Sequence, residues 1–172
     1  MNNLHIDLDE NIVNYVLEKT NVNIKEYTEK IVCFALEEQN ILIDDVYISI
    51  NSASKEEIKE INKEYRNIDK STDVLSFPIF DREEYQRMIS QNDEDKKIRE
   101  LELGDIIICL DVVEEHSKEY GTGLLREILY MITHGVSHLL GFDHIEENDK
   151  VEMRAFEEKI LGKLGVNRLD GE

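Results

Sequence analysis

Long apolar runs are absent from this sequence of 172 residues. A helix that crosses a bilayer takes about 20 predominantly apolar residues, and no stretch of the chain meets that requirement. The first residues, Met-Asn-Asn-Leu-His-Ile-Asp-Leu-Asp, also lack a basic region followed by an apolar segment, which is the pattern of a secretory signal. We therefore expect neither membrane insertion nor secretion.

Cysteine and proline are scarce. Cys33 and Cys109 lie far apart, each in an apolar run, so we interpret both as reduced core residues of a cytoplasmic protein. The single proline, Pro78, follows the short apolar segment 74–77. Because proline cannot donate a hydrogen bond to a neighbouring strand, this position is typical of an edge strand or an exit loop.

Positive charge is the third deficit. The chain has 20 lysines and arginines against 39 aspartates and glutamates, which gives a formal net charge of −19. Proteins that bind nucleic acids usually present a basic surface, so this balance argues against indiscriminate phosphate binding. Net charge does not locate charge, however, and an acidic protein can still contain one basic groove. The length predicts one domain over residues 1–172, with a core large enough to be stable without disulfides.

Hydrophobic periodicity predicts both strands and helices. We expect strands at residues 3–8, 45–50, 71–78 and 103–110, and the last is apolar enough to be buried on both faces. Expected helices have apolar residues spaced by three or four and cover residues 10–19, 24–39, 112–120, 124–140 and 146–164, with another from residue 55. Residues 81–102 are mostly charged or amide residues, which predicts a mobile loop or an exposed helical insertion.

Helix starts and core positions can also be predicted. Ser54 and Glu57 have the spacing of a capping box, and Asp111 and Thr122 are expected to cap the helices that follow them. The expected core residues of the helix from residue 55 are Ile58, Ile61, Tyr65 and Ile68. Those of the last helix are Val151, Met153, Phe156, Ile160 and Leu164.

The segment from His134 to His144 predicts a metal site. On a helix, His134 and His138 lie one turn apart on the same face, close enough to bind one cation. Gly141 stands where a helix commonly ends with a residue of positive φ, and the reversal would bring His144 back as a third ligand. A fourth position open to water is typical of a catalytic zinc site rather than a structural one.

This spacing is shared with the metzincin zinc proteases, whose pattern is H-E-x-x-H-x-x-G-x-x-H. The glutamate that acts as their general base is replaced here by Gly135, which has no side chain. The alternative is that the three histidines are surface or core residues that bind no metal. We favour the metal site because three of the chain's five histidines occur at this one spacing. His5 and His116 lie outside the pattern, and we assign them no role. Imidazole ligands suit zinc, nickel, copper and iron alike.

Several segments together resemble the bacterial YbeY family of rRNA-processing endoribonucleases. They are Ile61-Asn-Lys-Glu-Tyr-Arg66, Ser71-Thr-Asp-Val-Leu-Ser-Phe-Pro78, Gly104-Asp-Ile-Ile-Ile108 and His134-Gly-Val-Ser-His-Leu-Leu-Gly-Phe-Asp-His144. The segments occur in the family's order and span most of the chain from about residue 45 onward. Ser137 and Phe142 depart from the family's usual leucine and tyrosine, but neither position is a ligand.

The resemblance implies an α+β domain with a small mixed sheet of about four strands packed on several helices, one of them a buried helix that carries the metal ligands. It implies one divalent ion, zinc or another transition metal such as nickel, held by His134, His138 and His144, and a catalytic role for Arg66. The implied activity is cleavage of single-stranded RNA, with the 16S rRNA precursor as substrate. The implied process is 3′-end processing of 16S rRNA, together with maturation and quality control of the small ribosomal subunit. The implied partners are the proteins of that subunit, and neither DNA nor a membrane is expected as a partner.

Two other functions remain as alternatives. The ligand spacing fits a metalloprotease, although Gly135 opposes it, and a ribosome assembly factor with a structural metal would need no catalysis. Asp143 could supply the missing base or could instead orient a ligand or cap the turn. The acidic composition predicts weak binding to free RNA, helped by a ribosomal partner or by a local basic groove around Lys63, Arg66 and Lys70.

Overall fold

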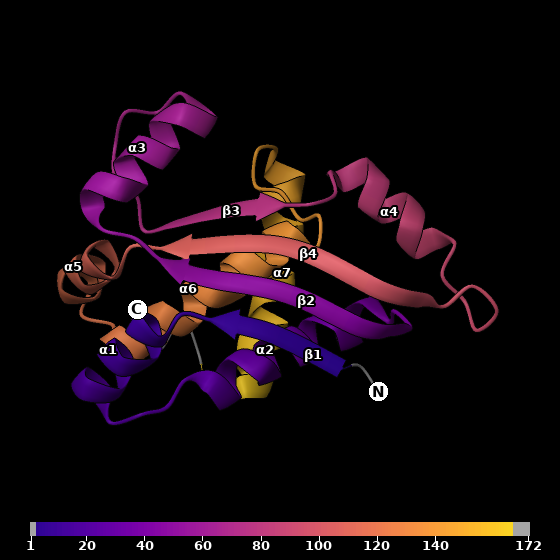
Figure 1. The fold of residues 1–172 in the computed structure, drawn as a ribbon, viewed down its shortest axis with the longest axis horizontal. Helices are drawn as coiled ribbons and strands as arrows, with labels where there is room; N and C mark the ends of the chain where they lie inside the picture. Colours follow the sequence, from indigo (N-terminus) through magenta and orange to yellow (C-terminus); the bar gives the residue numbers. More distant parts are fainter. Residues whose placement is uncertain (1–2, 167–172) are drawn as a thin grey trace.

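Residues 3–166 are described by the computed structural model, and they form one α+β domain built on a four-stranded mixed sheet (Figure 1). The strands are β1 (Asn3–Leu8), β2 (Ile43–Ser52), β3 (Val74–Pro78) and β4 (Ile98–Ile108). Their order is β1-β2-β4-β3, in which β1, β2 and β4 are parallel and β3 is antiparallel to β4. Pro78 thus ends an edge strand, as predicted from its missing N–H group.

Seven helices occur among the described residues. They are α1 (Glu10–Thr20), α2 (Lys25–Gln39), α3 (Lys55–Arg66), α4 (Arg82–Ser90), α5 (Leu110–Tyr120), α6 (Leu124–Leu139) and α7 (Glu147–Leu164). The segment 81–102 contains a helix, as one of the two predicted alternatives required, but Tyr85 of this helix is buried rather than exposed. The end of the segment, from Ile98, is the first part of β4, which we had expected to begin only at residue 103. Within the described part of the chain, no helix combines the length and apolar character needed to span a bilayer.

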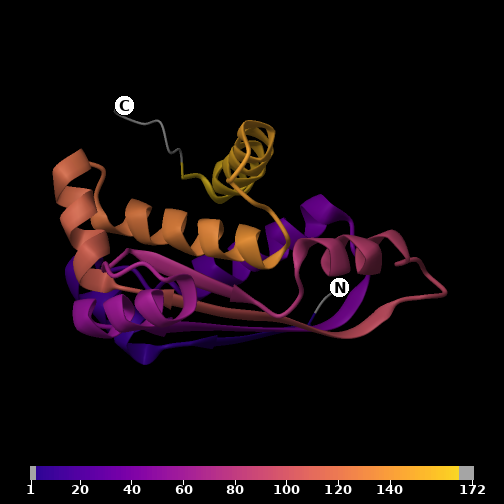
Figure 2. The ribbon, with the colours of Figure 1, turned by 90° about the horizontal axis from the view of Figure 1, so that it is seen from above.

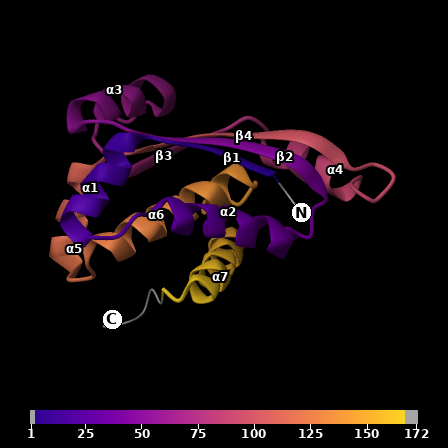
Figure 3. The same cartoon turned by 60° about the horizontal axis from the view of Figure 1, so that its bottom comes forward.

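The helices form layers. Helix α6 lies along the sheet and α7 crosses it as an outer layer (Figure 2), while α3 lies on the opposite side of the sheet from α2, α6 and α7 (Figure 3). The main core lies between the sheet and α1, α2 and α6. A second, smaller cluster beneath α3 contains Ile58, Leu75, Cys109 and Val112. Cys33 and Cys109 are both free thiols, as predicted, but only Cys109 is a buried core residue, since Cys33 is partly exposed.

Helix boundaries follow from local hydrogen bonds. The capping box at Ser54 and Glu57 is present at the start of α3. The prediction that Asp111 caps α5 was wrong, because the helix begins two residues earlier than expected, at Leu110, with Cys109 as its cap. Asp111 lies instead in the first turn, where its negative charge interacts favourably with the helix dipole. Thr122 is likewise not the cap of α6, which is Gly123.

Some expected core positions are exposed. Asp105 in the middle of β4 is exposed, so this strand is not buried on both faces as we had predicted. Helices cover one face of the sheet, but α3 covers only one end of the other face. Val151 is 68% exposed because it lies outside the inward stripe of α7, which includes Met153 and Phe156. Tyr65 and Ile68 are exposed as well, and Ile68 lies beyond the end of α3.

Candidate metal centre

The last turns of α6 carry His134 and His138. Most of this helix is buried, as its apolar pattern predicted, so the two imidazoles project from a rigid element. The helix stops at Leu139, and Gly141 then adopts a φ of +89°, which side chains disfavour. This reversal returns the chain toward the helix and brings His144 beside the other two histidines, as we expected.

The three histidines form a compact group. One ring nitrogen from each of His134, His138 and His144 lies within 4.8 Å of the corresponding atoms of the others. The ring centroids of His134 and His138 are 4.7 Å apart, and those of His138 and His144 are 4.9 Å apart. Nitrogen ligands of one tetrahedral zinc ion lie roughly 3.4 Å apart when Zn–N bonds are about 2.0–2.1 Å. Small side-chain rotations therefore suffice for these residues to hold a metal ion.

Two of the rings are held in the orientation that a metal ligand needs. His134 Nδ1 lies 2.7 Å from a carboxylate oxygen of Glu157, and His138 Nδ1 lies 3.1 Å from the backbone oxygen of Phe142. Both acceptors are oxygens, so each Nδ1 carries the proton and donates. The lone pair is then on Nε2 in each ring, which leaves that atom available to bind a cation.

Burial favours the neutral form of His138. Its pKa is lowered to about 4, chiefly by desolvation and then by the neighbouring His134, His144 and Arg66, against a smaller raising effect of the hydrogen bond to the backbone of Phe142. A neutral imidazole is the form that binds a metal. The donor set, its compactness and this neutrality all fit a divalent transition metal, whereas the donor chemistry does not distinguish zinc from nickel.

Position 135 faces the sheet and not the histidine cluster. A Cβ atom built at this position would lie 2.8 Å from Cδ1 of Ile106, a fully buried residue of β4. The face of α6 that carries position 135 is therefore pressed against the sheet. A glutamate here would enter the core rather than the metal centre, which explains in structural terms why the protease-like base is missing.

Arg66 lies in the same pocket as His138 and His144, although it comes from α3. The open pocket has a volume of about 390 Å³, and its lining includes Arg66, His138 and His144. The guanidinium Nη2 donates to the backbone oxygen of Ser76 at 3.3 Å, which holds Arg66 against β3. Lys63 and Lys70, which we grouped with Arg66 in a basic groove, are exposed and are not among the described residues that line this pocket.

Asp143 occupies the turn between the second and third ligands. Its Oδ1 accepts from the backbone N–H of His144 at 2.6 Å and from that of Ile145 at 3.1 Å. These bonds match the turn-capping alternative, and the same side chain also lines the pocket. The two remaining histidines lie elsewhere, His5 beside Asp45 and His116 beside Asp73.

Two residues near the site were missed by sequence reasoning. Glu157 contacts His134, and its signal was a carboxylate within the apolar stripe of a helix, next to Phe156. Arg82 lines the pocket and pairs with Asp149 of α7 at 3.0 Å. Nothing in its local sequence distinguished it from other charged residues of the segment 81–102.

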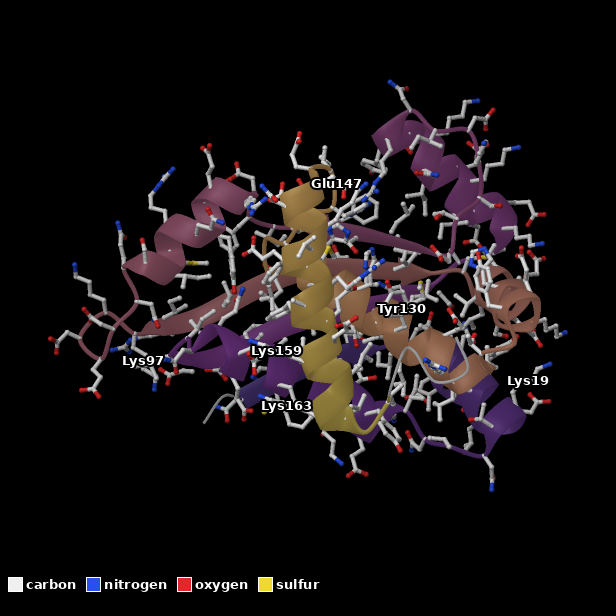
Figure 4. All side chains as sticks on the ribbon, turned by 180° about the vertical axis from the view of Figure 1, so that it is seen from behind. Lys19, Lys97, Tyr130, Glu147, Lys159 and Lys163 are labelled. Atoms are coloured by element: carbon white, nitrogen blue, oxygen red, sulfur yellow. The ribbon has the colours of Figure 1, made fainter. Side chains whose placement is uncertain are left out.

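Figure 4 shows Tyr130 of α6 beside α7. The ring of Tyr130 stacks on that of His134, with 5.9 Å between the ring centroids.

Comparison with known proteins agrees with this geometry. The model of the family described as Endoribonuclease YbeY matches residues 11–165. Endoribonuclease YbeY of Clostridium botulinum strain Langeland is 44% identical over 160 residues, which cover 87% of this chain and 93% of the relative. Endoribonuclease YbeY of strain Alaska E43 is 45% identical over 148 residues, which cover 83% of this chain and 89% of the relative. The solution structure of TM1509 from Thermotoga maritima is 28% identical with a TM-score of 0.52, covering 93% and 90% of the two chains. The chain therefore belongs to the Endoribonuclease YbeY family.

Proposed function

We propose that this protein is a metal-dependent endoribonuclease that cleaves single-stranded RNA. The observation that carries the proposal is that Arg66 and two members of the histidine cluster, His138 and His144, line one open pocket, although they come from distant parts of the chain. A cation site beside a guanidinium suits a phosphodiester, because the phosphate is anionic and gains charge in the transition state. The relatives' name, Endoribonuclease YbeY, supports the same substrate.

His134, His138 and His144 would hold one zinc ion or a similar metal such as nickel. When bound, the metal lowers the pKa of a water molecule and polarises a phosphoryl oxygen. Arg66 would bind the non-bridging phosphate oxygens, and its bond to Ser76 holds the guanidinium toward the pocket. Arg66 would thus bind and orient the phosphate, while Gly135 offers no base. Both backbone hydrogen bonds of Asp143 end on Oδ1, so its Oδ2 is the carboxylate oxygen at this turn that would be free to take a proton.

The resemblance extends the proposal to a physiological role. The substrate would be the 16S rRNA precursor, with the protein acting in 3′-end processing, maturation and quality control of the small ribosomal subunit in the cytoplasm. With a net charge of −19, the chain should bind free RNA weakly, so proteins of the small subunit would help to bring substrate and enzyme together.

The test uses metal-loaded and metal-stripped protein with labelled single-stranded RNA, duplex RNA, single-stranded DNA and an unfolded protein. We expect only single-stranded RNA to be cut, and only by the metal-loaded protein. Peptide cleavage with intact RNA would make the protein a protease instead. If changing His134, His138 and His144 together to alanine leaves ribosome maturation intact, the protein acts as an assembly factor.

Arg66→Ala tests the proposed phosphate contact. Loss of one donor that stabilises a transition state commonly lowers the rate by about 10²–10³. We expect a loss of that size in kcat/KM, with metal content and thermal stability unchanged. Arg99→Ala is the matched control, because Arg99 is exposed and is not among the described residues that line the pocket. Wild-type cleavage by the Arg66 variant would remove this residue from the mechanism.

A further inference from the structure

A buried carboxylate lies behind the histidine cluster. Glu157 is 4% exposed and belongs to the inward face of α7, together with Phe156 and Ile160. Helix α7 crosses α6 at this point, as seen from behind in Figure 4. Burying a carboxylate is unfavourable unless hydrogen bonds or opposite charge compensate. A glutamate at an apolar position of the helix therefore calls for a partner.

That partner is His134, whose Nδ1 lies 2.7 Å from the Glu157 carboxylate. The distance is that of a strong, charge-assisted hydrogen bond. The bond fixes which nitrogen carries the proton and how the ring is turned. His138 has a weaker version of this arrangement, because its Nδ1 donates over 3.1 Å to an uncharged backbone oxygen.

We propose that Glu157 is a positioning residue of the metal centre, which holds His134 in the tautomer and orientation that present Nε2 to the cation. The negative charge of Glu157 also partly offsets the charge of a divalent ion that is bound by three neutral imidazoles. Partners of this kind commonly change metal affinity by about 10-fold to 100-fold when they are removed. The inference rests on the metal-dependent function proposed above, but it concerns ion binding rather than cleavage.

The competing explanation is that the Glu157–His134 pair only joins α7 to α6. Helix α7 already packs on α2 and α6, and its buried face carries apolar residues, among them Met153, Phe156 and Ile160. A purely structural pair would change the unfolding temperature of the metal-free protein and leave the intrinsic affinity for the metal unchanged. Stability and metal affinity therefore have to be measured separately.

The experiment compares wild-type protein with Glu157→Gln, Glu157→Leu and the control Glu158→Gln. Glu158 is the adjacent glutamate of α7 and is exposed. Zinc affinity is measured by competition with a chromophoric chelator, the ligand field by the visible absorption of the cobalt(II) form, and stability by thermal unfolding of the metal-free protein. Since glutamine still offers a carbonyl oxygen to Nδ1–H, we expect its affinity to fall about 10-fold and that of the leucine variant about 100-fold.

We also expect a changed cobalt spectrum in both variants and wild-type behaviour in Glu158→Gln. If Glu157→Gln and Glu157→Leu both bind zinc within twofold of wild type, the positioning role is refuted, whatever happens to their unfolding temperatures. Should the leucine variant fail to fold, the nearly isosteric glutamine variant decides. A wild-type protein that binds no divalent metal would overturn both this inference and the proposed function. Affinity that depends on Glu157 in a protein that cuts no RNA would leave the inference standing and overturn only the nuclease.

Discussion

The close packing of α6 on the sheet predicts that Gly135→Ala destabilises the protein. The added Cβ would lie 2.8, 3.0 and 3.1 Å from Cδ1, Cγ2 and Cγ1 of Ile106. Rotation about the Cβ–Cγ1 bond of Ile106 moves only Cδ1, so it relieves only the first of these contacts. Because Ile106 is completely buried, the helix or the strand must shift to relieve the others. Overpacking of this kind costs about 1–3 kcal/mol, whereas replacing glycine by alanine inside a helix gains about 1 kcal/mol. We expect a net loss of about 1 kcal/mol.

The assay is urea and thermal unfolding of metal-free protein, where a loss of that size lowers the melting temperature by about 2–4 °C. Gly162→Ala is the matched control, because this glycine lies in α7 with no atom within 4 Å of a built Cβ. The control should be as stable as wild type or more stable. A second change, Ile106→Val, removes the nearest atom, so the double variant should lose less stability than the sum of the two single changes.

Two results would refute this reasoning. If Gly135→Ala is as stable as Gly162→Ala, helix propensity outweighs packing and α6 does not press closely on β4. If the changes at Gly135 and Ile106 are additive, the loss arises somewhere other than this contact. Either result would also remove the structural explanation for the missing base.

Two more predictions concern the ends of secondary structure elements. Hydrogen bonds from Asn11 and Ser52 lower the pKa of Asp9, so its ionised form stabilises the fold above the unfolded pKa of about 4, and this contribution is lost as the pH falls through the lower folded pKa. Denaturant unfolding should therefore show Asp9→Asn less stable than wild type at pH 7, with the difference in stability narrowing as the pH falls below about 4; a difference that is independent of pH would contradict this. Gly141→Ala should lose about 1–2 kcal/mol and bind zinc more weakly, because its φ is +89° and a Cβ would lie 3.2 Å from Tyr85. Chelator competition checks the second effect, and unchanged affinity would mean that the turn does not place the third histidine.

Much of the fold was predictable because its signals are local. The capping box of α3 needs only Ser54 and Glu57, and the two-residue period of β1 needs only one buried face. Exposure was harder to predict, because it depends on what lies above each face. Tyr65 follows Ile58 by two helical turns and shares its face, yet it is 66% exposed, and its ring packs edge-on against that of Phe77 in the edge strand β3.

The site residues differ in the same way, since some could be predicted from local sequence and others depend on tertiary packing. The histidine spacing and Gly141 are encoded within eleven consecutive residues, so local geometry was enough to predict the cluster. Glu157 and Arg82 reach the site from α7 and α4 through tertiary packing, for which spacing holds no information. Arg66 was named from the family resemblance alone, since its own helix offers several cations at equivalent spacing.

The two faces of α6 constrain the chemistry together. One face carries His134 and His138 of the histidine cluster, and the other face presses Gly135 onto Ile106. A base placed at position 135 would therefore destabilise the helix that positions the ligands, so this fold cannot regain the protease arrangement by a single substitution. The polar groups around the cluster have to come from other elements, such as Arg66 of α3. A guanidinium attracts anionic oxygen and does not accept a proton at neutral pH, which favours a phosphodiester over a peptide as the substrate of this pocket.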